Sequence, residues 1–208
     1  ITDKDVVAPI DSLLTRICER NDIDREKIKL HLVDKDEVNA FALPDYHMVV
    51  YTGLIEDCEN EAELCGIIAH ELAHLEKGHI MQKLVKEVGL AVLISMTSGN
   101  GNPEIIKQAV KVLTSSAYDR KLETEADLTG AEYLINAGID PEAFAAFMFR
   151  MSEQEKGLPD QLYWVSTHPG SEERTQAILD YIEDREVKVE MILDSTQWMT
   201  LKENISKN

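Results

Sequence analysis

The stretch HELAHLEKGH, from His70 to His79, holds three of the six histidines of the chain. On an α-helix, residues i and i+4 project from the same side about one turn apart, so His70 and His74 present two imidazoles to one point. Glu71 is rotated by about 100° from His70 and lies at the edge of that point. Two imidazoles with an adjacent carboxylate at this spacing are typical of two zinc ligands and a general base. The pattern predicts a metal site on this helix.

Apolar residues around the two histidines indicate that the helix is largely buried. They are Ile67, Ile68, Ala69, Leu72 and Ala73. Two unpartnered histidines inside a buried helix would cost free energy, so the alternative of two solvated histidines is disfavoured. The third histidine, His79, follows His74 by five residues, which is about 140° round a continuous helix. It should not touch the same ion, and we predict a role in the core or at a helix end.

A third ligand must come from elsewhere, because a catalytic zinc takes three protein ligands and keeps a fourth place for water. The stretch ETEAD, residues 123–127, offers it, since Glu123 and Asp127 are i and i+4 on a predicted helix. If Glu123 reaches the metal, Asp127 lies one turn further on and can accept the free N–H of a ligating histidine. Glu125 points off that face and is expected in solvent. In a chain with 39 acidic residues, ExxxD gains weight only by following HExxH.

Other segments supply the elements that must position these groups. Apolar residues at helical spacing predict helices over residues 6–20, 120–136, 141–155, 171–183 and 195–205. They also predict a helix from residue 60 through residue 79 and beyond, and another that begins near residue 103. Alternating apolar residues predict strands at residues 27–34, 38–43 and 47–53. Pro44 and Asp45 suit the turn of an antiparallel hairpin, and Asn60 suits the cap of the histidine helix. Ser195 or Thr196 is expected to cap the last helix.

These elements predict an α+β fold that is mainly α, with a small antiparallel sheet preceding the HExxH helix. A chain of 208 residues is enough for one substantial domain, and neither an internal repeat nor a low-complexity linker divides it. We therefore expect a single domain over residues 1–208, with the motifs between about 28 and 183.

Composition narrows the functional classes. A formal charge of −18 argues against nucleic acid, whose phosphates need Lys and Arg, and disfavours an anionic membrane surface. The three cysteines, Cys18, Cys58 and Cys65, form no CxxC pair, so neither a disulfide scaffold nor a zinc ribbon is indicated. A Cys58–Cys65 bridge is disfavoured by helical spacing.

The sequence contains no run of about 18 apolar residues that would span a membrane. The nearest candidate, Val88–Met96, is half that length, and it is either a buried helix or a lid or membrane-touching segment beside the active site. The chain begins at Ile1 without a Met. We therefore expect a processed or truncated form, whose removed N-terminus could have carried a signal or a lipid anchor for peripheral membrane association.

The motifs resemble a known family. HELAH followed by ETEAD resembles the gluzincin metallopeptidases, in which thermolysin also has HExxH followed by ExxxD. Further stretches resemble specifically the family of HtpX, BepA and the CAAX prenyl proteases: NAFALP (39–44), VVYTGL (49–54), ENEAELCGIIAHELAH (59–74) and THPGSEER (167–174). The resemblance covers residues 39–177. It implies a zincin-like domain with one Zn²⁺ on His70, His74 and Glu123, Glu71 as general base, and a peptide bond as target.

His168 and Arg174 match the HPxxxxR spacing of the family. There a THP stretch brings a histidine near the metal, where it either stabilises the tetrahedral intermediate or caps the zinc as an inhibitory ligand. Arg174 is expected either to help stabilise an oxyanion or to hold Asp127 or another carboxylate. Asn39 and Ala40 are candidates for substrate binding, because a strand edge beside a cleft can pair with an extended peptide. The alternative for them is an ordinary strand.

We therefore expect a zinc-dependent metalloendopeptidase acting on unfolded or misfolded polypeptides in quality control of the bacterial cell envelope. Its expected location is the periplasm or another part of the cell envelope. Two rivals stay open. In a latent form, His168 closes the fourth coordination place, and the protein acts as a binding or chaperone-like module until the loop is displaced. In a structural zinc module, four protein ligands hold the ion without hydrolysis, and Glu71 would serve no purpose.

Overall fold

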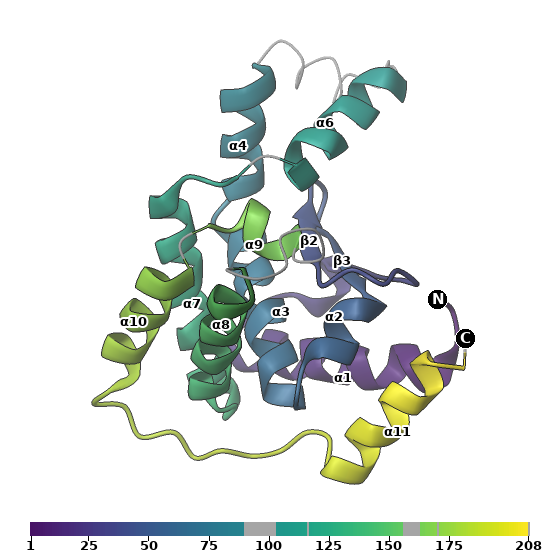
Figure 1. Ribbon diagram of the computed structural model, residues 1–208, viewed down its shortest axis with the longest axis vertical. Helices are drawn as coiled ribbons and strands as arrows, with labels where there is room; N and C mark the ends of the chain where they lie inside the picture. Colours follow the sequence, from purple (N-terminus) through teal and green to yellow (C-terminus); the bar gives the residue numbers. More distant parts are fainter. Residues whose placement is uncertain (90–102, 116, 156–162, 170, 208) are drawn as a thin grey trace.

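The computed structural model describes residues 1–89, 103–115, 117–155, 163–169 and 171–207. This part is mainly helical, with one three-stranded sheet, which confirms the predicted fold class (Figure 1). The helices are α1 (Lys4–Arg20), η1 (Arg25–Lys27, a 3-10 turn), α2 (Thr52–Asp57), α3 (Glu61–Glu76), α4 (His79–Val88), α6 (Pro103–Ser115), α7 (Arg120–Ala137), α8 (Pro141–Glu155), α9 (Tyr163–Thr167), α10 (Ser171–Ile182) and α11 (Ser195–Ile205). The strands are β1 (Lys29–Val33), β2 (Ala40–Leu43) and β3 (His47–Tyr51).

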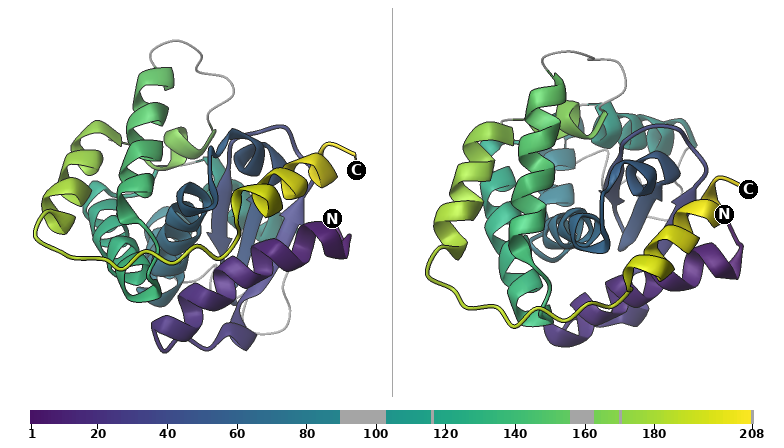
Figure 2. Two further views of the ribbon diagram at one scale, coloured as in Figure 1. Left: turned by 90° about the horizontal axis from the view of Figure 1, so that it is seen from below. Right: turned by 60° about the horizontal axis from the view of Figure 1, so that its bottom comes forward.

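Helix α3 lies at the centre of the molecule, between α7 and α8 on one side and the sheet on the other, with α1 across its end (Figure 2). It begins at the cap predicted from the sequence, because the Asn60 side chain accepts a hydrogen bond from the Glu63 N–H at 3.0 Å. Fourteen of its sixteen residues are buried. A helix buried on all sides holds its side chains in fixed positions, which is what a preorganised site requires.

Two glycines allow α7 and α8 to approach α3 closely. A Cβ atom on Gly130 of α7 would lie 3.1 Å from the His70 backbone nitrogen. A Cβ atom on Gly66 of α3 would lie 2.5 Å from the Cβ of Phe144 on α8, closer than real contacts allow. The approach at Gly130 brings the acidic residues of α7 beside the histidine turn of α3.

The sheet is mixed, so the expectation of a wholly antiparallel sheet is wrong in one pairing. Strand order is β1-β3-β2, and β2 pairs antiparallel with β3 as predicted. β1 pairs parallel with β3, with Lys29 opposite His47. The prediction assumed that successive strands are neighbours, whereas the chain crosses from β1 to the far edge before returning through β3. The hairpin turn passes through Asp45 and Tyr46, both at positive φ.

Several predicted boundaries shift in the structure. The third strand ends at Tyr51 rather than Gly53, because the short helix α2, which the sequence analysis did not predict, starts at Thr52. The last helix is capped by Asp194, not by Ser195 or Thr196, through a capping box with Gln197. Helix α9 was likewise not predicted from the sequence.

The histidine helix is also shorter than predicted. It ends at Glu76, and Gly78, at φ 69° and ψ 21°, turns the chain into the separate helix α4. A left-handed residue after a helix end suits glycine, which has no Cβ to clash. The consequence is that His79 begins a new helix and is not constrained by the rotation of α3.

Cys18, Cys58 and Cys65 are buried and free, as the sequence analysis favoured. Among the described residues, none of the helices combines the length and the apolar character that crossing a bilayer demands. The stretch Val88–Met96 lies, after Gly89, outside the described residues.

Candidate metal centre

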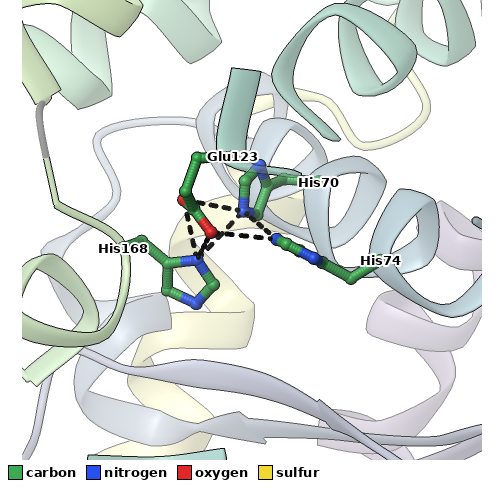
Figure 3. Close-up of side chains that lie close together, drawn as sticks. All are labelled: His70, His74, Glu123 and His168. Atoms are coloured by element: carbon green, nitrogen blue, oxygen red, sulfur yellow. Dashed lines mark hydrogen bonds and ion pairs between the residues drawn. The ribbon is translucent and has the colours of Figure 1, made fainter. Parts of the chain in front are cut away.

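Four buried side chains from three parts of the chain converge on one point (Figure 3). His70 and His74 come from α3, Glu123 from α7, and His168 directly follows α9. Their donor atoms lie within 4.8 Å of one another. The Nε2 atom of His70 is 3.0 Å from His74 Nε2 and 3.1 Å from His168 Nδ1. The carboxylate oxygens of Glu123 lie 3.0 Å from His168 Nδ1 and 3.3 Å from His74 Nε2.

These spacings fit a tetrahedral metal ion. An ion about 2.05 Å from each of four donors holds neighbouring donors about 3.3 Å apart. Three imidazole nitrogens and a carboxylate oxygen form a donor set that suits zinc. The cluster therefore contains the three ligands expected from the sequence and a fourth donor, His168.

The charge of the buried groups also fits a bound cation. Glu71, Glu123 and Asp127 are carboxylates, and Arg174 is the guanidinium beside them; each is at most 4% exposed. Their formal charges sum to −2, and the buried ammonium of Lys83, whose pKa burial lowers to about 8 and which also interacts with Glu123 and Glu71, reduces this excess to −1 at pH 7. An excess of negative charge in a low-dielectric interior is unfavourable unless it is compensated, so it favours a bound cation.

The protonation of two of these groups is set for metal binding. Burial holds the pKa of His74 well below its ordinary value, which leaves the neutral ring with a lone pair to donate. For Glu123, burial acts to raise the pKa, but the nearby His168 and Arg174 outweigh it and hold the pKa well below the usual range. Both shifts favour the species that binds a cation.

Glu71 lies next to the cluster but is not part of it. Its Oε2 accepts a hydrogen bond from the Ala42 backbone N–H at 2.9 Å, and its Oε1 accepts one from the Trp164 indole at 3.3 Å. Oε1 is also 3.3 Å from His168 Nε2. A carboxylate held in this way beside a group of potential metal ligands has the position of a general base.

Asp127 and Arg174 form a layer behind the ligands. Asp127 Oδ1 lies 2.9 Å from Nδ1 of His70, and its carboxylate accepts two hydrogen bonds from Arg174, at 2.6 and 2.7 Å. Arg174 also contacts Glu123 Oε2 and donates to the His168 carbonyl, both at 2.7 Å. Its contacts correspond to the second role expected from the sequence, in which it holds carboxylates rather than facing a substrate.

His168 is sandwiched between two aromatic rings that the sequence analysis missed. The rings of Trp164 and Tyr118 both stack on its imidazole, with centroid-to-centroid distances of 4.9 Å and 5.3 Å respectively. A signal was available for Trp164, which precedes His168 by four residues, the spacing of one helical turn. For Tyr118, which precedes the α7 cap Asp119, nothing local points to the site.

His79 stays outside the four-residue cluster, but it does not lie on the far side of α3 as a continuous helix would require. Its Nδ1 is 3.0 Å from Nδ1 of His74, and it is 1% exposed. Glu125 is half exposed, in line with the expectation, yet its carboxylate lies 3.5 Å from His79 Nε2. The break at Gly78 accounts for the difference.

The two substrate-binding candidates lie on the sheet edge nearest α3. The Asn39 carbonyl accepts a hydrogen bond from the Tyr51 N–H, and Ala40 pairs with Val50. Asn39 is 4% exposed, and within the described part of the chain its side-chain oxygen has no hydrogen-bond partner. The same strand donates the Ala42 N–H to Glu71, so this edge reaches the site.

Comparison with known proteins assigns the chain to a family. The model of peptidase family M48 matches residues 7–182. The chain belongs to peptidase family M48. This confirms the resemblance to HtpX and BepA inferred from the motifs.

Three relatives illustrate the range of this M48 chain's similarity. The mitochondrial metalloendopeptidase OMA1 of Schizosaccharomyces pombe is 28% identical over 87% of this chain and 54% of its own length. The beta-barrel assembly-enhancing protease of Yersinia pestis is 26% identical over 77% of this chain and 35% of its own. The metalloprotease LoiP of Escherichia coli is 28% identical over 77% and 65%. The chain thus spans less than two thirds of each relative.

Replacing Arg174 tests the charge balance of the site. In Arg174→Ala, Asp127 and Glu123 lose their cationic partner, and we expect the metal-free protein to lose about 3–5 kcal/mol of unfolding free energy. Denaturant unfolding in the presence of a chelator measures this loss. The control is Arg185→Ala, whose pair with Glu132 has both side chains more than a third exposed and should contribute at most about 1 kcal/mol. Equal losses in the two variants would contradict the account.

Proposed function

We propose that this chain is a zinc-dependent metalloendopeptidase, with His70, His74 and Glu123 as metal ligands and Glu71 as general base. The observation that carries the proposal is the position of Glu71, hydrogen-bonded beside a buried group of four potential metal donors. When bound, zinc supplies a Lewis acid that activates water and polarises a carbonyl. The relatives named as metalloendopeptidases support the same reaction class.

The chain's own groups divide the remaining work. Glu71 takes a proton from water and returns one to the leaving amine, and its bonds to Ala42 and Trp164 fix the carboxylate for both transfers. The carboxylate of Asp127, 2.9 Å from His70 Nδ1, would accept its N–H when the ring binds the ion through Nε2; without the ion, His70 Nδ1 has no hydrogen-bond partner among the described residues. Arg174 neutralises the two carboxylates behind the ligands.

The edge of β2 that does not pair with β3 is the proposed site for the substrate backbone; Ala40 is fully buried there, so a bound peptide would displace the groups that cover it. In an antiparallel pair, backbone groups of alternate residues point to opposite sides. The Asn39 carbonyl bonds across to Tyr51, whereas the Ala42 N–H points the other way, to Glu71. The backbone of Ala40 therefore faces the side of Glu71, where an extended peptide can pair with it. Such pairing requires an extended chain, which favours unfolded or misfolded polypeptides as substrates.

The proposed setting is protein quality control in a bacterial cell envelope, with a periplasmic location. It rests on the similarity to LoiP and to the beta-barrel assembly-enhancing protease. Immunoblotting of periplasmic and cytoplasmic fractions of the native cell tests the location, and a purely cytoplasmic protein would contradict it.

One observation favours the latent state as the form that the structure represents. The Nδ1 atom of His168 lies among the proposed ligand atoms, and its Nε2 atom lies 3.3 Å from Glu71. The imidazole therefore fills the space between the proposed metal position and the proposed general base. Water and the scissile carbonyl need that space. We therefore propose that His168 is a displaceable fourth donor. A purely structural zinc module would not account for the hydrogen bonds that fix Glu71.

Glu71→Gln separates metal binding from catalysis. The amide cannot take a proton but can still accept the Ala42 hydrogen bond, so one zinc per chain should remain while kcat falls by roughly 10²- to 10⁴-fold. Elemental analysis and cleavage of fluorescent casein, with and without chelator, measure the two properties. Glu76→Gln, at the exposed end of the same helix, is the control. Undiminished cleavage by Glu71→Gln would remove Glu71 from the mechanism.

His168→Ala distinguishes the two roles of that residue. If the imidazole blocks the fourth place, its removal should raise casein cleavage by about tenfold or more, which corresponds to a closed state favoured by about 1.4 kcal/mol. Zinc content should stay at one per chain, since three ligands remain. His31→Ala, at an exposed histidine of β1, serves as control. Activity at or below that of the parent would rule out the block, and a large decrease would support oxyanion stabilisation instead.

A further inference from the structure

The two proposed histidine ligands of α3 differ in what holds their second nitrogen. His70 Nδ1 lies 2.9 Å from the carboxylate of Asp127, a common partner for a metal-bound imidazole. His74 Nδ1 lies instead 3.0 Å from another imidazole nitrogen, Nδ1 of His79. His79 in turn places its Nε2 3.5 Å from the carboxylate of Glu125. The three side chains form a line from the ligand cluster to the half-exposed Glu125.

Gly78 makes this arrangement possible. The left-handed turn at Gly78 ends α3 and starts α4 with His79, so the imidazole folds back onto the last turn of α3. Among the described residues, no atom lies within 4 Å of the place where a Cβ on Gly78 would be. The position therefore favours glycine because of its positive φ and not because of crowding. The result is a histidine that is 1% exposed and stacked edge-on to His74, with ring centroids 5.0 Å apart.

The proton positions along this line follow from valence alone. The Nε2 atom of His74 faces His70 and Glu123, so a metal at the cluster takes its lone pair. Neutral His74 then carries its hydrogen on Nδ1 and must donate it. Two nitrogens 3.0 Å apart form a hydrogen bond only if one is an acceptor, so Nδ1 of His79 is unprotonated. The hydrogen of His79 is left on Nε2, which points to Glu125.

We propose that His79 and Glu125 are positioning residues that fix the metal-binding tautomer of His74. The inference rests on the proposed zinc site and adds to it a support for the second ligand. Glu125, 3.5 Å from Nε2 of His79, orients that ring by electrostatic attraction of its N–H, and His79 orients His74 by accepting from Nδ1–H. Neither touches the metal or the substrate. The ring of His70 faces an ionised carboxylate, whereas the ring of His74 faces a neutral imidazole, which is a weaker hydrogen-bond acceptor.

Zinc affinity and proton positions test the proposal. In zinc-loaded parent protein, long-range ¹H–¹⁵N spectra should show His79 protonated at Nε2 alone and His74 at Nδ1 alone. In competition with a chromophoric chelator, His79→Leu should bind zinc about 10- to 100-fold more weakly. His79→Asn is the matched control, because its side-chain oxygen can accept the His74 hydrogen and should restore affinity to within about threefold of the parent.

Glu125→Gln is a further variant, at a half-exposed position where folding is not at risk. Its amide oxygen still attracts the His79 N–H but without charge, so we expect a loss of zinc affinity smaller than that of His79→Leu. Either a proton on Nδ1 of His79 in the zinc-loaded parent or unchanged zinc affinity in His79→Leu would contradict the positioning role of His79 and Glu125. Neither result would contradict the proposed zinc site. A parent protein that binds no zinc would contradict both the proposed function and the positioning role of His79 and Glu125. The spectrum of the parent decides the question even if His79→Leu does not fold.

Discussion

The buried negative charge around the histidine turn is the constraint on which the rest of this structure depends. Glu71, Glu123 and Asp127 lie together in the interior, and Arg174 is the cation that faces two of them. Carboxylates in such a place are stable only when opposing charges and donors surround them. The fold meets this need with Arg174, with the Ala42 N–H and the Trp164 indole, and with a cluster of donors shaped for a divalent cation. A bound metal cation would add to this charge balance.

Packing then determines which groups meet. Because fourteen of its sixteen residues are buried, α3 holds its two imidazoles in place on one face. Gly130 lets α7 come close enough for its acidic residues to reach them. The sheet contributes its edge strand, whose Ala42 N–H touches Glu71 directly. One bond thus joins the proposed base to the proposed peptide-binding edge. Any shift of β2 relative to α3 would change both at once.

Local spacing made part of this site predictable. The i, i+4 pairs HExxH and ExxxD fix side-chain directions within one turn, so His70, His74, Glu123 and Asp127 could be assigned to facing sides from sequence. What the sequence could not give depends on distant parts of the chain. Whether His168 acts as a ligand or faces an oxyanion depends on where α9 packs, and the parallel pairing of β1 depends on the path of the crossover.

His79 shows a different kind of limit. The 140° rotation predicted for His79 holds only on a continuous helix, and Gly78 is a residue type that commonly ends helices. The apolar pattern runs on through Ile80 and Leu84, both buried in α4, so periodicity alone did not reveal the break.

In the latent state proposed above, the four donors would complete a metal site and at the same time block catalysis. His168 satisfies the cluster and reaches Glu71, while Trp164 and Tyr118 cover its ring and Arg174 holds its carbonyl. These contacts stabilise the closed arrangement, so displacement of His168 requires that a substrate replace them. The edge of β2 offers such replacement, because each backbone hydrogen bond formed by an extended peptide contributes about 1 kcal/mol. A peptide long enough to pair along that edge could offset the lost contacts, whereas a short one could not. Selection for extended chains would then arise from the cost of opening the site.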